Sequence, residues 1–303
     1  MDARVLVIGE ALIDIVEAGG RVRELVGGSP ANVAVGVARQ GHEVHLLTRI
    51  GRDERGARIA EHIAASGAAI TADSWADTAT ATAHARIGAG GAAEYEFDID
   101  WAVAAPTLED VALVHSGSIA LFLEPGGDAV AAALQRAAAG RALVTLDPNI
   151  RPALVGDRDA AVRRVGQVLG AVDLVKLSDE DAAWLYPGMI AEQVLAELSA
   201  HGPRLVVMTR GGSGVMALGP GGIIEVPAWI VPVADTIGAG DTFNAGVLAA
   251  LDRAGALSRA GLDRLTPEVL AQALVLGTRA AAITVSRPGA NPPWAHELAA
   301  LPA

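Results

Sequence analysis

The chain has 303 residues, of which 51% are hydrophobic and 19% are charged, and this balance is typical of a globular protein. Its formal net charge of −12 at pH 7 argues against nucleic acid or an anionic membrane as the main partner. The absence of cysteine excludes disulfides, thiolate zinc sites and cysteine nucleophiles.

The first residues carry charges at Asp2 and Arg4 and lead straight into a short apolar run, which is not the pattern of a secretory signal peptide. No uninterrupted apolar run reaches the ~18–20 residues that a membrane-spanning helix needs. We therefore expect a cytoplasmic protein that binds neither membranes nor nucleic acids.

Short apolar runs typical of strands alternate with amphipathic segments typical of helices along most of the chain. The expected strands are residues 5–8, 44–48, 113–115, 142–147, 174–177 and 205–209. The expected helices between them include residues 55–65, 128–139 and 191–201. Nearly continuous apolar strands, each followed by a helix, predict a parallel sheet buried on both faces. We expect a three-layer α/β/α sandwich whose ligands bind beyond the carboxyl ends of the strands.

Two stretches depart from this alternation. Residues 12–26 have the pattern of a β-hairpin, and residues 78–101 alternate in the same way. We expect them to form a small β-sheet that acts as a lid over a main α/β domain. That main domain would comprise residues 1–11, 27–77 and 102–303. Residues 252–268 are predicted to be a loop that ends where Thr266 and Pro267 start a helix.

The segment GGSPANVAVGVARQG has the features of a helix start, with Ser29 as the N-cap and Pro30 as the first helical residue. A helix start explains neither Asn32, a poor helix former, nor the pair Gly27 and Gly28. Close approach of the backbone to a ligand, with the Asn32 amide binding sugar hydroxyls, would explain both. Upstream, Asp14 is a lone carboxylate among apolar residues, and it either lies exposed in a turn or pairs with ligand hydroxyls at the lid junction.

Polar groups also follow the later strands. Arg151 could meet a substrate oxygen or phosphate, or only a surface acid. Lys176 is a candidate phosphate neighbour, while Ser178 and Asp181 have the spacing of a capping box, a place where acids could also organise hydrated magnesium. The glycine-rich segment at residues 209–214 is either a hairpin turn or a wall of a nucleotide site.

The segment DTIGAGDTFNAGVLAAL carries the strongest chemical signal. Gly238, Ala239 and Gly240 form a turn that leads into Asp241 and an apolar helical pattern. Glycines let several N–H groups converge, and the first turn of a helix suits an anion such as phosphate. A carboxylate in the same turn is placed to take a proton, which is what phosphoryl transfer to a hydroxyl requires. The alternative is a glycine-rich loop before a buried helix, with Asp241 favoured there by the helix dipole.

Several common motifs are absent. The first strand is not followed by GxGxxG, and neither GxxxxGK[ST], HExxH nor GxSxG occurs. These absences argue against a dinucleotide site there, the common P-loop, and the usual metalloprotease and serine-hydrolase sites.

In this order, the segments resemble the ribokinase-like (phosphofructokinase-B) family of sugar kinases. Residues 27–41 are similar to its first signature and residues 235–251 to its second, DTxGAGDxF. The segments LDPNIR, VKLSDED and AAAITVSRPGA fall where the family has similar segments, so the likeness spans essentially the whole chain. GEALIDI, LDPNIR and VKLS are most similar to the fructokinases and the 2-keto-3-deoxygluconate kinases.

The resemblance implies a mostly parallel sheet with a β-lid, and phosphorylation of a sugar hydroxyl by Mg·ATP. It implies Asp241 as the catalytic base and the amides of Gly238, Ala239 and Gly240 as an anion hole. The expected sugar-binding residues are Asp14, Gly27, Gly28, Asn32, Arg151 and Asp241. The expected nucleotide-binding residues are Lys176, Ser178, Thr209, Gly211, Gly214, Gly238, Gly240 and Ala282.

Two metal sites are implied as well. Asp181 would hold Mg²⁺ through water, although it is one methylene shorter than the glutamate that is common in the family. Many members bind a monovalent cation such as K⁺, for which Asp235 would be the side-chain ligand, with backbone carbonyls near Ile237 and Gly289.

We therefore expect a fructokinase-like ketohexose kinase. The alternatives are a 2-keto-3-deoxygluconate kinase, then a ribokinase or nucleoside kinase. A hypothesis of a different class is a non-catalytic sugar or nucleotide sensor on the same fold. A homodimer formed through the lid is also expected, because such dimers are common in the family.

Overall fold

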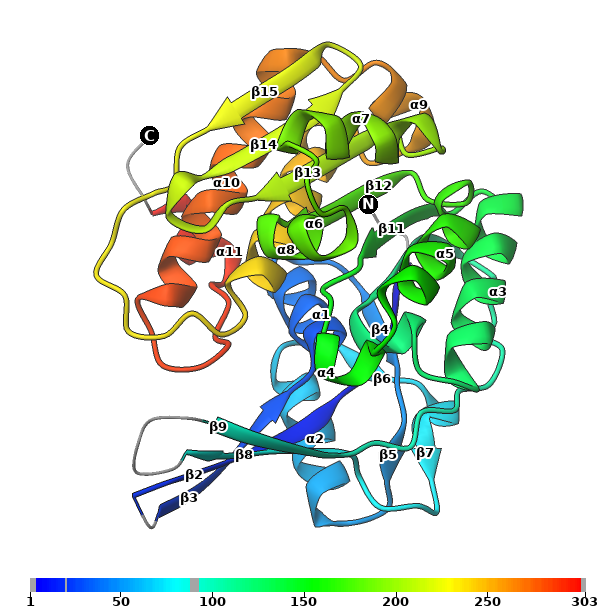
Figure 1. Cartoon of the computed structure of the whole chain (residues 1–303), viewed down its shortest axis with the longest axis vertical. Helices are drawn as coiled ribbons and strands as arrows, with labels where there is room; N and C mark the ends of the chain where they lie inside the picture. The colour runs from blue at the N-terminus through cyan, green and yellow to red at the C-terminus, as the bar shows by residue number, and fades with distance from the viewer. Residues whose placement is uncertain (1–3, 20, 88–92, 301–303) are drawn as a thin grey trace.

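The computed structural model describes residues 4–19, 21–87 and 93–300. Its largest element is a mostly parallel sheet. The strands of this main sheet are β1 (Arg4–Ile8), β4 (Val44–Leu47), β6 (Ala69–Ile70), β10 (Val111–Gly117), β11 (Leu143–Asp147), β12 (Leu174–Ser178), β13 (Leu205–Thr209), β14 (Val215–Gly219) and β15 (Gly222–Val226). They lie in the order β15-β14-β13-β12-β11-β10-β1-β4-β6 (Figure 1).

Among the described strands of this sheet, the antiparallel pairs are those of β14 with β13 and with β15. The strands from β13 across to β6 pair in parallel, so their carboxyl ends meet at one edge. The predicted parallel α/β sheet is confirmed, and each expected strand is present with bounds that differ by two residues or fewer.

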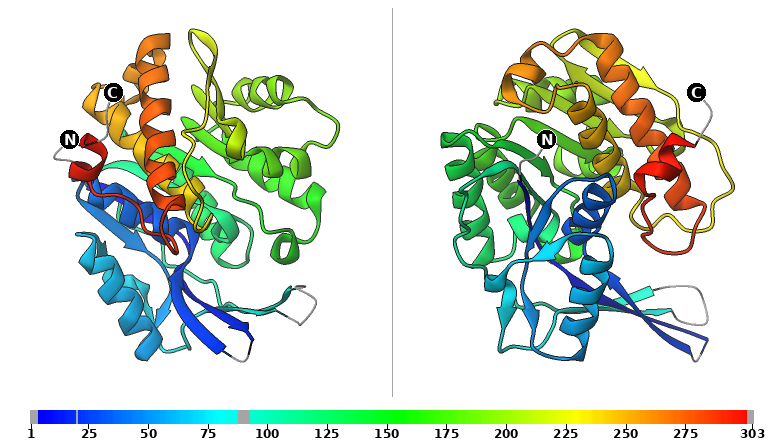
Figure 2. Two further views of the ribbon diagram at one scale, coloured as in Figure 1. Left: turned by 90° about the vertical axis from the view of Figure 1, so that its left-hand side faces the viewer. Right: turned by 180° about the vertical axis from the view of Figure 1, so that it is seen from behind.

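Helices cover both faces of the sheet (Figure 2). One face carries α1 (Ser29–Arg39), α2 (Glu54–Ala65), α8 (Ala239–Arg253), α9 (Arg259–Asp263) and α10 (Pro267–Val285). The other carries α3 (Gly126–Ala139), α5 (Arg158–Leu169), α6 (Asp179–Leu185) and α7 (Ala191–Ala200). Strand residues alternate between the two cores: Val5 and Val7 pack on the first face, Leu6 and Ile8 on the second. This is the expected three-layer sandwich.

A separate four-stranded sheet projects from the main body (Figure 1). Its strands are β2 (Leu12–Ala18), β3 (Arg21–Gly27), β8 (Thr82–Ile87) and β9 (Ala93–Asp98), in the order β3-β2-β8-β9. The hairpin expected at residues 12–26 is β2 paired with β3. Residues 88–92, inside the second expected lid stretch, lie outside the described residues.

Short elements join the larger ones. They are β5 (Ile50–Gly51), β7 (Trp75–Ala76), η1 (Ala72–Ser74), η2 (Ser118–Leu121), η3 (Gly211–Ser213), α4 (Pro152–Val155) and α11 (Ala295–Ala299). One expectation was wrong: the region predicted as a loop contains α9. The helix start at Thr266 is confirmed, because its hydroxyl accepts a hydrogen bond from the amide of Val269.

Within the described ranges, α10 is the one helix long and apolar enough to cross a bilayer. Length and composition are weak evidence, since core helices of globular proteins meet the same criteria. In this fold α10 packs along α8 and against β14 and β15.

Candidate active site

A cavity of about 970 Å³ opens at the carboxyl edge of the main sheet. Its wall includes the ends of several parallel strands, the first turn of α8, and Asp14, Ala83 and Phe97 of the four-stranded sheet. Parallel sheets place their ligand sites at this edge. The predicted sugar and nucleotide residues therefore share one space, except that Gly27 does not line it, and neither do Asp235 and Gly289 of the expected cation site.

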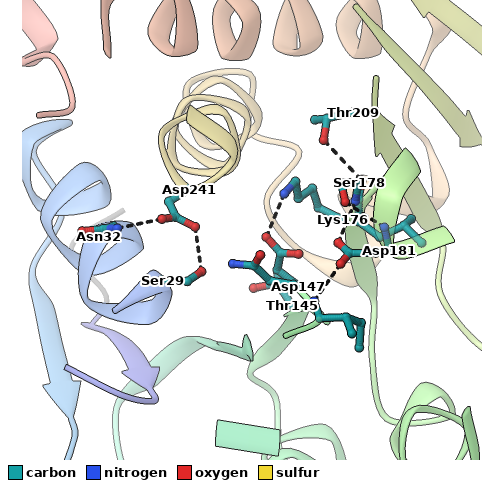
Figure 3. Close-up of polar contacts among 12 residues, drawn as sticks. Ser29, Asn32, Thr145, Asp147, Lys176, Ser178, Asp181, Thr209 and Asp241 are labelled. Atoms are coloured by element: carbon teal, nitrogen blue, oxygen red, sulfur yellow. Dashed lines mark hydrogen bonds and ion pairs between the residues drawn. The ribbon is translucent and has the colours of Figure 1, made fainter. Parts of the chain in front are cut away.

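Asp241 lies in the first turn of α8, only 6% exposed, and lines the cavity. Its Oδ1 accepts a hydrogen bond of 2.6 Å from the hydroxyl of Ser29, and its Oδ2 accepts one of 2.8 Å from Nδ2 of Asn32 (Figure 3). Both donors belong to α1, which packs against α8. The carboxylate is thus fixed at the mouth of the sheet, where it can accept a proton from a ligand hydroxyl.

The contact of Ser29 corrects one expectation. Ser29 was predicted to be the N-cap of the first helix, but the N-cap is Gly28 and no side chain caps it. Gly28 has φ of 106°, a conformation that suits glycine, and a side chain there would meet the carbonyl oxygen of Glu10 at 2.4 Å. The glycine pair therefore allows close backbone packing, and Gly27 leaves room for the Asp14 carboxylate.

The glycine turn before Asp241 has the predicted shape. Gly238 is the N-cap of α8 with a left-handed φ of 74°, and Ala239 and Gly240 are the first helical residues. All three line the cavity. The first N–H groups of a helix have no intrahelical acceptor, and they lie at the positive end of the helix dipole. The turn therefore presents donors for an anion beside the Asp241 carboxylate, although the amide of Ala239 already donates to the carbonyl oxygen of Thr236 at 3.3 Å.

A buried ion pair lies next to this turn. Nζ of Lys176 is 2.9 Å from Oδ2 of Asp147, and the two side chains are 5% and 1% exposed (Figure 3). Burial raises the pKa of Asp147 to about 6, although the ammonium opposes this shift. Burial would lower the pKa of Lys176, but the carboxylates of Asp147, Asp181 and Asp241 outweigh it and raise that pKa. Both groups are therefore charged at neutral pH.

The end of the cavity near the four-stranded sheet carries acids and one cation. Burial raises the pKa of Glu10 to about 7, opposed by a hydrogen bond with Ser118, and the pKa of Asp14 to about 6, opposed by Arg151. Nη1 of Arg151 donates to the side-chain oxygen of Asn149 at 2.7 Å. Such a set of acceptors and donors suits the hydroxyls of a small polyol.

The opposite end lies beyond β12 and β13. Thr209, Gly211, Gly214 and Ala282 all line the cavity there, as expected. The segment at residues 209–214 forms the predicted turn between β13 and β14, and residues of it also line the cavity.

Sequence reasoning missed an apolar strip along this end. Trp229, Ile230 and Val233 line the cavity and are 39%, 80% and 65% exposed. The guanidinium of Arg279 lies 4.7 Å from the centre of the Trp229 ring. These residues occur in a proline-containing loop without periodicity, and an apolar run outside the expected strands and helices is a signal that could have found them.

Ser178 and Asp181 form the predicted capping box of α6. The carboxylate of Asp181 accepts hydrogen bonds from the amides of Ser178 at 3.0 Å and Ile150 at 2.7 Å, so each oxygen holds a backbone group. Asp179 and Glu180, at the same helix start, line the cavity. No group of three or more His, Asp or Glu side chains within the described ranges forms a metal cluster.

Asp235 links two loops beside α8. Its Oδ1 accepts a hydrogen bond from the amide of Ile237 at 3.0 Å, and its Oδ2 accepts one from the amide of Gly289 at 2.9 Å. The three residues implied by the resemblance as a monovalent-cation site are therefore neighbours in space.

The roles of Glu10, Ser29 and Ser118 were not predicted. Glu10 and Ser118 line the cavity at the ends of β1 and β10, which are adjacent strands. A polar residue within two positions of the end of a buried strand is the signal that could have identified Glu10 and Ser118.

Comparisons with known proteins agree with this geometry. Residues 2–297 match the model of the pfkB family carbohydrate kinases. A fructokinase of Rhizobium leguminosarum bv. trifolii is 31% identical over 279 residues, covering 88% of this chain and 85% of the relative. A fructokinase of Klebsiella pneumoniae is 34% identical over 262 residues, covering 83% of this chain and 85% of the relative. A crystal structure of a Xylella fastidiosa fructokinase with bound ATP is 26% identical, with a TM-score of 0.83 over 96% of this chain and 94% of that chain.

Proposed function

The chain belongs to the pfkB family of carbohydrate kinases, as an ATP-dependent, fructokinase-like sugar kinase, and we propose that it phosphorylates fructose with Asp241 as the catalytic base. The observation that carries the proposal is the position of Asp241 beside the glycine turn, within one cavity that also holds Asn32 and Asp14.

In the proposed reaction, a sugar hydroxyl lies between Asp241 and the γ-phosphate of ATP. The hydroxyl oxygen attacks phosphorus in line, its proton passes to Asp241, and the bond to the leaving oxygen of ADP breaks. The amides of Gly238, Ala239 and Gly240 stabilise the charge on the transferring group. Removing one such donor typically costs about 10²–10³ in rate.

Magnesium fits the donor set near α6. A magnesium ion bound with ATP would neutralise phosphate charge, and it keeps several waters and needs only one or two carboxylates. Asp179 and Glu180 line the cavity and are available for that role. Asp181 stays a prediction as a ligand through water, and its backbone contacts give it a second task in holding the loop at Ile150.

The acids at the sugar end favour a neutral sugar. Glu10, Asp14 and Asp241 surround the region that Arg151 reaches, so a second anionic group on the substrate would meet repulsion. The 2-keto-3-deoxygluconate alternative needs a cation for the substrate carboxylate, and the candidates are Arg151 and Arg86, whose side chain lies outside the described residues. The guanidinium of Arg151 is instead directed to Asn149 of its own loop.

We also propose that the four-stranded sheet closes over the sugar as a lid and excludes water. Its contribution of Asp14, Ala83 and Phe97 to the cavity wall supports this role. Val22 and Leu25 of β3 are 62% and 46% exposed, which supports a homodimer formed through this sheet. Sedimentation of wild type and a Val22→Lys, Leu25→Lys double variant would test the dimer, which the double variant should dissociate.

Potassium is the proposed monovalent cation. The carboxylate of Asp235 and the carbonyls near Ile237 and Gly289 would bind it and fix the loops beside α8. Activity should therefore be higher in potassium than in tetramethylammonium chloride. Equal activity in the two salts would show that the hydrogen bonds of Asp235 suffice.

The function is tested by ADP release from wild type with a panel of sugars. Fructose should support the highest kcat/KM, and 2-keto-3-deoxygluconate, ribose and nucleosides much lower values. Asp241→Asn should lower turnover by about 10²–10⁴, the range for loss of a general base. Sugar binding without sugar-dependent ADP release by wild type would favour the sensor.

A further inference from the structure

Lys176 stands out among the cavity residues because its charge lies directly beside the glycine turn. Its neighbours in β12, Val175 and Leu177, pack into the core on one face of the sheet. Alternation along the strand sends the Lys176 side chain to the opposite face, on which α8 lies. A methyl group added to Gly240 would lie 2.8 Å from the Lys176 ammonium.

Asp147 fixes the ammonium in this place. It ends β11, the strand next to β12, and its Oδ2 accepts the Lys176 hydrogen bond of 2.9 Å. Oδ1 of Asp147 is buried and has no hydrogen-bond partner among the described residues. Burying a carboxylate for a single partner is costly, and it is expected where the partner must be held in one position.

We infer that Lys176 is a catalytic residue that binds the transferring phosphoryl group, and that Asp147 is the positioning residue that keeps its ammonium beside the turn. The inference rests on the proposed function. As the sugar oxygen bonds to phosphorus and the bond to ADP breaks, negative charge spreads over the phosphoryl oxygens. The Lys176 ammonium keeps its proton throughout, while the hydroxyl proton passes to Asp241. A cation held beforehand at that point stabilises the transition state without reorganisation.

The chain offers a matched buried aspartate far from the cavity. Asp173 precedes β12 at the opposite edge of the sheet and is 2% exposed. It accepts hydrogen bonds from Arg204 at 2.7 Å and Arg259 at 3.1 Å. Asp173→Asn therefore reports the general cost of disturbing a buried ion pair in this sheet.

Gly240→Ala separates the lysine from the backbone donors. The substitution keeps the amide of residue 240, but its methyl group displaces the end of the flexible lysine. Gly166→Ala in α5 is the matched control, because a methyl group there meets nothing within 4 Å.

The test measures kcat, both KM values, and binding of ADP alone and of ADP with aluminium fluoride, a mimic of the transferring phosphoryl group, with fructose and magnesium present. Lys176→Met should lower kcat by about 10², and Asp147→Asn and Gly240→Ala by about tenfold. All three should weaken binding of the aluminium fluoride complex more than binding of ADP. Asp173→Asn and Gly166→Ala should keep wild-type kcat.

Two results would overturn the inference. One is wild-type kcat in Asp147→Asn, and the other is equal weakening of ADP and of its aluminium fluoride complex in all three variants. Both results are compared with a wild-type protein that shows sugar-dependent ADP release. Absence of sugar-dependent ADP release from wild type would instead reject the proposed function.

Discussion

The hydroxyl of Ser29 donates a 2.6 Å hydrogen bond to Asp241, although the two residues are 212 positions apart in the chain. Asn32 holds the other carboxylate oxygen from the same helix. The two signature segments are therefore one structural unit, in which the first orients the carboxylate that the second supplies as the proposed base.

Ser29→Ala should lower kcat by about tenfold, because Asp241 loses one of the two contacts that fix its orientation. The KM for ATP should change little, since the glycine turn is intact. Steady-state kinetics would check this against Ser66→Ala, which removes a buried hydroxyl bonded only locally, to Ile63 and Ala68. Equal kcat values for the two variants would show that Ser29 does not orient the base.

The stability of the protein should fall as pH rises from 4.5 to about 7, through the titration of Glu10. Its pKa is raised in the folded state, so the folded protein binds more protons than the unfolded chain in this window. The contribution is at most about 3 kcal/mol. Urea unfolding of wild type and Glu10→Gln at several pH values would measure this contribution. The free energy of unfolding of the variant, relative to that of wild type, should rise between pH 5 and pH 8. A difference between the two proteins that does not change with pH would contradict the prediction.

Trp229→Ala should raise the KM for ATP by about tenfold, the order expected from loss of stacking on a nucleotide base. The KM for fructose should be unchanged, because Trp229 lies at the opposite end of the cavity. Trp294→Ala is the matched control: Trp294 is 38% exposed, against 39% for Trp229, and it also stacks with an arginine, Arg39. An equal KM for ATP in both variants would show that Trp229 does not bind the nucleotide.

Asp173→Asn should lower the free energy of unfolding by about 1–3 kcal/mol. Removing one partner of a fully buried ion pair costs about 3–5 kcal/mol, but Arg204 and Arg259 are about a third exposed and regain some hydration. Denaturant unfolding would measure the loss. A value near zero would mean that the amide keeps all the useful contacts.

The fold was predictable because its strands are nearly uninterrupted apolar runs. The segment of β13, for example, was predicted with its observed bounds, since Leu205, Val206, Val207 and Met208 alternate between two cores and must all be apolar. The short helix α9 was missed. Its residue Arg259 donates a hydrogen bond to Asp173, which is 86 positions away, and the local sequence pattern cannot reveal such a contact.

The site was predictable where chemistry is encoded locally. Glycines and Asp241 within one turn predicted a carboxylate at the cavity, whereas Ser29 was misassigned because a hydroxyl before a proline is most often a helix cap. Its acceptor could be found only after α1 and α8 were packed together. The contact of Asp147 was not predicted for the same reason, since its partner Lys176 comes from the neighbouring strand.

The pairing of α1 with α8 also has a consequence for protein synthesis. A nascent chain emerging from the ribosome displays Ser29 and Asn32 early, but it lacks Asp241 until more than three quarters of the sequence has been translated. Under the proposed mechanism, unfinished chains can therefore present most of the proposed sugar-binding residues without being able to consume ATP.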